Sequence, residues 1–195
     1  MEEGYIKYKC HLTERELEHY PEMNEINAVR SELVKLNMIG VYPSGISFGN
    51  ISIRLSGERF IITGTQTGAF NILLPEHFTI VKEADIKRNA IECVGLRPAS
   101  SESLTHSAFY KSSEDINSVI HIHNLSLWKK LLFKVPTIPD TCEYGTTEIA
   151  EAVSELINTN IQQHSGVIAL AGHFEGIVSY GFDLYSAYGE IKKYL

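Results

Sequence analysis

Two histidines stand one residue apart in the apolar segment "VIHIHN", where His121 and His123 flank Ile122. In an extended strand, side chains two positions apart point to the same face of the sheet. Both imidazoles can therefore bind one ion, while Ile122 packs on the opposite face. The pair alone is equally compatible with two histidines that line the polar side of a sheet, so a metal site requires a third ligand.

His173 is the candidate for that third ligand, because it follows a second apolar strand in "LAGHFEGIVSYG". Three neutral imidazoles around an open coordination position are typical of catalytic zinc sites, whereas structural sites are closed by four ligands. Another divalent transition metal could bind the same residues. The alternative for His173 is a turn histidine without a ligand role. The remaining histidines are expected to be structural or at the surface: His11, His19, His77, His106 and His164.

A second candidate site lies in "RPASSESLTH", where a helix is expected to begin with Ser100 or Ser101 as its N-cap. Free backbone N–H groups and the helix dipole favour an anion at such a start. A simple helix cap with Glu102 in the first turn is the alternative. His106 lies four residues after Glu102 on the same helix face, where it could orient the carboxylate or only pack.

Two loops rich in glycine, serine and threonine add a third candidate, "GISFGN" and "TGTQTG". Such loops let backbone donors approach an oxyanion closely. A tight turn is the alternative for each loop.

The composition limits the class of protein. The chain has 195 residues, of which 44% are hydrophobic and 21% charged, as in ordinary globular proteins. One domain over residues 1–195 is expected, with residues 1–21 as an N-terminal extension. The formal net charge of -7 argues against a nucleic-acid partner, because phosphate backbones are bound by clustered lysine and arginine.

The cysteines and the N-terminus indicate a cytoplasmic protein. Cys10, Cys93 and Cys142 are far apart, odd in number and without a CxxC pair, so reduced thiols are expected. "MEEGYIKYKC" has no apolar core of a signal peptide. No apolar run reaches the ~18 residues of a membrane helix, so no membrane partner is expected.

The elements that must position these residues follow from apolar periodicity. A helix is predicted over residues 22–40, with Gly40 as its C-terminal stop. Alternation over residues 51–55, the turn "SGE" and the apolar run 60–62 predict a β-hairpin. Further strands are predicted at 78–85, 89–96, 117–123, 166–172 and 176–181, and further helices at 100–113, 125–132, 146–161 and 183–195. Consecutive strands joined by short turns favour a largely antiparallel sheet covered by helices.

Five segments, taken in order, resemble the class II aldolase/adducin family: "SFGNISIR", "TQTG", "SSESLTH", "VIHIHN" and "GHFEGIVSYG". The resemblance runs from about Asn24 to the C-terminus. It implies an α/β fold, a three-layer α/β/α domain around a mainly antiparallel sheet. It also implies a homotetramer with active sites between subunits.

The resemblance also assigns roles to residues. His121, His123 and His173 match the family's zinc ligands, and Glu102 matches its acid/base carboxylate. The positions that match those holding the substrate phosphate are Ser47, Asn50, Thr67, Gly68, Ser100 and Ser101.

The implied function is a zinc-dependent aldolase, a lyase that cleaves a small ketose phosphate such as fuculose 1-phosphate into dihydroxyacetone phosphate and an aldehyde. The family also contains a sugar-phosphate 4-epimerase and a methylthioribulose-phosphate dehydratase, and both activities remain alternatives on the same site. A non-catalytic adducin-like module is less favoured, because that branch has lost the metal ligands that this chain keeps.

Two segments depart from the family pattern. Residues 124–148 are shorter than the family segment that supplies a tyrosine to a neighbouring active site, and Tyr144 is the only tyrosine there. No equivalent of the family's tyrosine-carrying C-terminal tail is expected either. Glu175 follows His173 where the family has a direct His-Gly step. It either reaches the metal or fills a structural role, and the second is favoured because charged turn residues usually face solvent.

Overall fold

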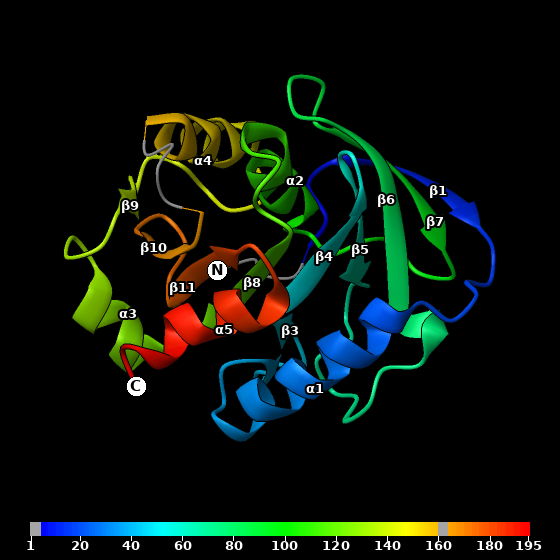
Figure 1. Ribbon diagram of the computed structural model, residues 1–195, viewed down its shortest axis with the longest axis horizontal. Coiled ribbons are helices and arrows are strands. Elements are labelled where there is room, and N and C mark those ends of the chain that lie inside the picture. Colours follow the sequence, from blue (N-terminus) through cyan, green and yellow to red (C-terminus); the bar gives the residue numbers. More distant parts are fainter. Residues whose placement is uncertain (1–4, 160–163) are drawn as a thin grey trace.

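The computed structural model describes residues 5–159 and 164–195 (Figure 1). Within them, nine strands form one sheet, in the spatial order β1 (Lys9–Glu14), β7 (Ala90–Gly95), β6 (Phe78–Asp85), β5 (Arg59–Thr63), β4 (Asn50–Ser56), β8 (Ser118–His123), β11 (Gly176–Gly181), β10 (Gly166–Leu170) and β9 (Thr137–Ile138). Neighbouring strands are antiparallel except for the pairs β1–β7 and β9–β10. A small separate ladder joins β2 (Gly40–Val41) to β3 (Ser47–Phe48). The predicted mainly antiparallel sheet is confirmed.

Helices cover both faces of this sheet. Figure 1 shows α2 (Ser103–Ser112) and α4 (Thr147–Thr159) on one side, and α1 (Pro21–Lys35) and α5 (Leu184–Lys192) on the other. The short helix α3 (Leu125–Leu131) packs into the same core as α1 and α5. The predicted three-layer α/β/α architecture is therefore confirmed. None of the helices in the described part of the chain is long and apolar enough to cross a membrane.

The buried apolar residues form two cores, and β8 contributes side chains to both. Val119 belongs to the core under α2 and α4, whereas Ile120 and Ile122 belong to the core under α1, α3 and α5. Because side chains alternate along a strand, His121 and His123 point to the side of Val119. The sequence prediction that both imidazoles share one face, with Ile122 on the other, is confirmed.

Two predicted helix ends are wrong. The first helix ends at Lys35, and Asn37 has a left-handed φ of 53° just beyond it, so Gly40 is free to enter β2. Asparagine tolerates this conformation and so can end a helix as glycine does. At α2 the N-cap position is Glu102, because the backbone N–H of Ser103 already bonds to the carbonyl of Ser100 in a preceding turn.

The other predicted elements are present: the β4–β5 hairpin, β6, β7, β8, α3, β10, β11 and α5. The helix predicted over 146–161 is α4, and its last two predicted residues lie outside the described part of the chain. Strand β1 was not predicted, because "KCHLTE" has too few apolar side chains to alternate. It pairs with β7 and places the free thiols of Cys10 and Cys93 3.8 Å apart.

Candidate functional site

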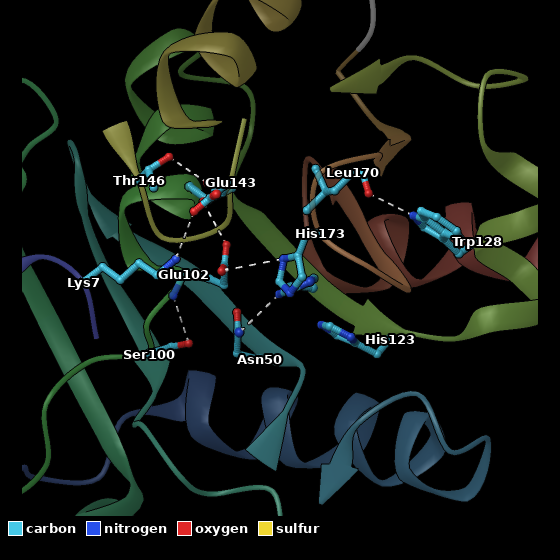
Figure 2. A network of polar contacts seen from close by, with 12 residues as sticks. Lys7, Asn50, Ser100, Glu102, His123, Trp128, Glu143, Thr146, Leu170 and His173 are labelled. Carbon is cyan, nitrogen blue, oxygen red and sulfur yellow. Dashed lines mark hydrogen bonds and ion pairs between the residues drawn. The ribbon is translucent and has the colours of Figure 1, made fainter. Parts of the chain in front are cut away.

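The three histidines meet at one end of the central strands. His121 and His123 come from β8, and His173 comes from the turn between β10 and β11, whose Gly176 is paired with His123. All three are buried, and one ring nitrogen of each lies within 4.8 Å of those of the others. Figure 2 shows His123 and His173 converging with Asn50 and Glu102. The arrangement can hold one divalent metal ion, as the sequence predicted.

The ring of His121 has the burial and the charge state of a metal ligand. Its Nε2 is buried and has no hydrogen-bond partner within the described residues. Burial, followed by the neighbouring rings of His123 and His173, holds the pKa of His121 well below its ordinary value. The imidazole is therefore neutral, which is the form that coordinates metals. A buried nitrogen without a partner is costly, and a bound metal removes that cost.

Protein side chains face the other nitrogens of the β8 histidines. The side-chain amide nitrogen of Asn50 lies 3.5 Å from Nδ1 of His121. The hydroxyl oxygen of Tyr42 lies 3.0 Å from Nδ1 of His123. Contacts of this kind orient metal-ligating histidines. A proton on Nδ1 leaves the Nε2 lone pair for a metal. His123 meets this condition when it donates to Tyr42, and His121 meets it when the Asn50 amide is turned so that its oxygen faces Nδ1, because an amide nitrogen only donates.

Glu102 supplies a buried carboxylate beside the histidines. Its Oε1 lies 3.9 Å from Nδ1 of His173, and its Oε2 accepts a hydrogen bond of 2.9 Å from the hydroxyl of Thr105. His106 does not orient it, because the fully buried His106 ring pairs with the hydroxyl of Ser52 at 2.7 Å on β4. Of the two sequence interpretations of His106, the structural one is therefore confirmed.

A small cavity opens beside Glu102, and most of the residues that line it are polar. Five of the six residues predicted to bind phosphate line it: Ser47, Asn50, Thr67, Ser100 and Ser101. The sixth, Gly68, donates its backbone N–H to Ser47 Oγ at 3.0 Å. A Cβ at Gly68 would overlap the carbonyl oxygen of Gly40, so this close approach requires glycine.

Arg30, which the sequence analysis did not single out, holds the loop on one side of this cavity. It is 1% exposed, and its guanidinium donates to the carbonyls of Phe70 at 2.6 Å, Thr67 at 3.0 Å and Gly68 at 3.1 Å. Burial lowers the pKa of Arg30. The sequence signal that could have identified Arg30 is its place directly after Val29, one of the apolar positions of the predicted helix.

Tyr144 also lines the cavity, although the sequence assigned it no role. Its ring centroid lies 4.9 Å from that of His173. The ammonium of Lys7 lies 4.1 Å above the Tyr144 ring and 3.7 Å from the carboxylate of Glu143, the latter contact being drawn in Figure 2. Tyr144 thus belongs to the side chains that line the cavity beside His173.

Glu175 does not simply face solvent. It is half-buried, and its Oε2 accepts a hydrogen bond of 3.2 Å from the hydroxyl of Tyr42. The backbone of Glu175 is left-handed, with φ 65°, and this conformation accompanies the inward direction of the side chain. Neither Tyr42 nor this contact was expected from the sequence, because the two residues are 133 positions apart.

Comparisons with known proteins agree with this geometry. Residues 44–193 match the family model described as Class II Aldolase and Adducin N-terminal domain. The chain is 32% identical over 157 residues to an L-fuculose phosphate aldolase from Methanococcus maripaludis, covering 73% of this chain and 77% of that protein.

Solved structures show the same fold. An L-fuculose 1-phosphate aldolase matches with a TM-score of 0.64 at 19% identity, covering 90% of this chain and 82% of that one. YgbL from Escherichia coli matches with a TM-score of 0.66 at 19% identity, covering 88% of this chain and 84% of that one. Both likenesses concern the arrangement of helices and strands.

Proposed function

Because the chain belongs to the class II aldolase and adducin family, we propose that it is a zinc-dependent lyase that cleaves a small ketose phosphate, such as fuculose 1-phosphate, into dihydroxyacetone phosphate and an aldehyde. One observation carries the proposal: three buried histidines and a buried carboxylate stand at one end of a cavity lined by hydroxyls. Retention of all three histidines speaks against a non-catalytic adducin-like module.

The phosphate is proposed to bind among neutral donors. Ser100 and Ser101 lie in the turn before α2, where the N-terminal backbone N–H groups of the helix favour an anion. Ser47 and Asn50 line the same cavity. Holding the phosphate fixes the distance from the anion to the reacting carbon atoms, which lowers the entropic part of the barrier.

His121, His123 and His173 are proposed to hold Zn²⁺, and another divalent transition metal is compatible with the same nitrogens. The ion would supply Lewis-acid stabilisation of the negative charge that develops on the substrate's carbonyl oxygen.

Two proton transfers complete the cleavage. When the carbon–carbon bond breaks, its electron pair stays on the carbon next to the carbonyl, and that carbon must gain a proton. The adjacent hydroxyl must lose a proton as it becomes the aldehyde. We assign the first transfer to Glu102, which would donate as the carboxylic acid, and the second to Tyr144, which would accept as the phenolate, since both line the cavity beside His173. After cleavage Tyr144 holds the proton that the hydroxyl lost, and exchange with solvent would return both groups to their starting forms.

The test is a screen of zinc-loaded protein against fuculose 1-phosphate and related ketose phosphates, with dihydroxyacetone phosphate measured by a coupled assay. Release from at least one substrate, abolished by a chelator, is expected. Mass spectrometry separates the alternatives, since a dehydratase product loses water and an epimerase product keeps its mass. Release of dihydroxyacetone phosphate from none of the substrates would overturn the aldolase assignment.

The family relation also leads us to propose a cytoplasmic homotetramer built from one domain per chain. Large exposed side chains, such as Ile72 at 70% and Phe133 at 76%, offer apolar surface for subunit contacts. Light scattering should give the mass of four chains, and the mass of a single chain would contradict the tetramer.

A further inference from the structure

Two loops that are distant in sequence meet behind His123. Tyr42 lies in the turn between β2 and β3, and Glu175 lies in the turn between β10 and β11. The Tyr42 hydroxyl oxygen is 3.0 Å from Nδ1 of His123 and 3.2 Å from Oε2 of Glu175. The three side chains therefore form a continuous hydrogen-bonded chain that leads away from the metal site.

The carboxylate end of this hydrogen-bonded chain determines which group donates in each bond. At that end the Tyr42 hydroxyl donates its hydrogen to Oε2 of Glu175. The oxygen of Tyr42 is then left to accept from Nδ1–H of His123. With the proton on Nδ1, the lone pair of His123 resides on Nε2, the nitrogen available to a metal shared with His121 and His173.

The backbone of Glu175 has a conformation that is unfavourable for a residue with a side chain. Its φ of 65° lies in a turn closed by the N–H of Gly176 and the carbonyl of His173 at 2.8 Å. Glycine or asparagine ordinarily takes a turn position with positive φ, because other side chains are strained there. Strain of this kind persists where the surrounding structure enforces it, and often at functional sites.

The β10–β11 turn and the segment just before β2 are both hydrogen-bonded to the end of β8. The N–H of His123 bonds to the carbonyl of Met38 at 3.0 Å, and the N–H of Asn124 bonds to the carbonyl of Glu175 at 3.1 Å. Phe48 packs between Tyr42 and His123, with ring centroids 4.4 Å and 5.8 Å away. The chain of hydrogen bonds is thus preorganised by its surroundings.

We propose that Tyr42 and Glu175 are positioning residues for the metal, a tyrosine–carboxylate relay that holds His123 in its metal-binding tautomer and increases the basicity of its Nε2. The inference rests on the proposed metal site. Among the described residues, neither lines the cavity and neither belongs to the cluster of three histidines that could hold the ion. Partners of this type usually change metal affinity by about 10- to 100-fold when they are removed.

The first experiment measures Zn²⁺ affinity by competition with a chromophoric chelator, for Tyr42→Phe and Glu175→Gln. Tyr42→Phe should weaken binding by about 10- to 100-fold, and Glu175→Gln by less, because its amide oxygen can still accept from Tyr42. The absorption bands of Co²⁺-loaded protein should shift in both variants. Matched controls are Tyr188→Phe on α5 and Glu151→Gln on α4, which should bind Zn²⁺ as the wild type does.

Glu175→Gly separates positioning from a structural role. Glycine relieves the backbone strain, so the Tm of the metal-free variant should equal or exceed that of the wild type, while Zn²⁺ affinity falls. Wild-type affinity and unshifted Co²⁺ bands in Tyr42→Phe and Glu175→Gly would overturn the relay and leave the metal site intact. A wild-type protein that binds no divalent metal would overturn the proposed function and the relay together.

Discussion

At the scale of single residues, Glu102 is distinguished by its burial and by its neighbours. Its carboxylate is 2% exposed, bonded to Thr105 and 3.9 Å from the His173 ring. We expect Glu102→Gln to bind metal normally but to lower kcat by about 10²- to 10⁴-fold, because the amide cannot transfer a proton. Metal analysis and steady-state kinetics of the same preparation check this. Full activity in the variant would remove Glu102 from the proposed proton transfer.

Tyr144→Phe tests the second proton transfer. The ring stays in place against His173 while the hydroxyl is lost, so Zn²⁺ affinity and KM should change little and kcat should fall by about 10²-fold or more. Tyr185→Phe, at a 58% exposed position, is the matched control. A variant whose KM rises with kcat unchanged would instead assign the hydroxyl to substrate binding.

His106 makes the stability of the fold depend on pH. Burial lowers its pKa from 6.5 to about 3, so between these values the unfolded chain binds the proton more readily than the native protein. Stability should therefore fall as the pH drops below about 6.5, by about 2 kcal/mol at pH 5. Two other titratable groups lie near His106. The pKa of His121 is also lowered, and the hydroxyl of Tyr110 bonds to the same Ser52 hydroxyl as His106 does.

Comparison with His106→Asn isolates the contribution of His106. Urea unfolding of metal-free protein between pH 4 and pH 8 should give a flatter profile for the variant than for the wild type. Parallel profiles would show that His106 does not carry the predicted pH dependence.

Which residues could be found from sequence depends on how local their signal is. Strand periodicity predicts that His121 and His123 share one face, and the position of His173 after an apolar strand makes it the third candidate ligand. The bond between Tyr42 and Glu175 joins two turns 133 residues apart, and no local pattern encodes it. His106 was placed correctly on the helix, but its partner Ser52 lies on a strand 54 residues away.

At the scale of elements, Arg30 links α1 to the loop that lines the cavity. Arg30→Met should remove the guanidinium from four carbonyls of that loop, on Thr67, Gly68, Phe70 and Asn71. The carbonyl of Thr67 keeps a bond from the N–H of Phe70, whereas the others lose this donor. Each unpaired buried acceptor is costly, so the free energy of unfolding should fall by about 2 kcal/mol or more. KM for the phosphorylated substrate should rise, since Thr67 lines the cavity.

Arg59→Met, at an exposed position on β5, is the control and should change neither quantity. Denaturant unfolding and steady-state kinetics check the pair. An Arg30→Met variant with the KM of the wild type would show that the loop keeps its shape without the guanidinium.

Elements with strong periodicity were predictable, and those fixed by tertiary contacts were not. Buried strands such as β8 and β11 are rich in valine and isoleucine and bounded by turns, so their positions follow from sequence. Strand β1 has only partial burial and owes its conformation to pairing with β7. The end of α1 depends on the left-handed backbone of Asn37. Asparagine tolerates this conformation, but an asparagine in the sequence does not by itself predict it.

At the scale of the whole molecule, the site depends on long-range assembly. Its groups come from β8, the β10–β11 turn, the turn before α2, β3 and the start of β4, the loop after β5 and the segment before α4. Tyr8 connects the N-terminal segment to the same region, since its hydroxyl donates to the carbonyl of Ala99 at 2.7 Å. Because these segments are remote in sequence, the unfolded chain cannot present them together to a metal.

Metal binding should therefore stabilise the native state alone. At a free Zn²⁺ concentration 100 times Kd, the gain is about 2.7 kcal/mol, which should appear as a rise in Tm relative to chelator-treated protein. His121→Ala removes one of the three converging imidazoles and should lose most of this rise, whereas His19→Ala, at an exposed position before α1, should retain it. A similar zinc-dependent rise in wild type and His121→Ala would mean that the stabilising ion binds elsewhere. Loss confined to His121→Ala would instead tie the stability of the sheet to an ion held by β8 and the β10–β11 turn.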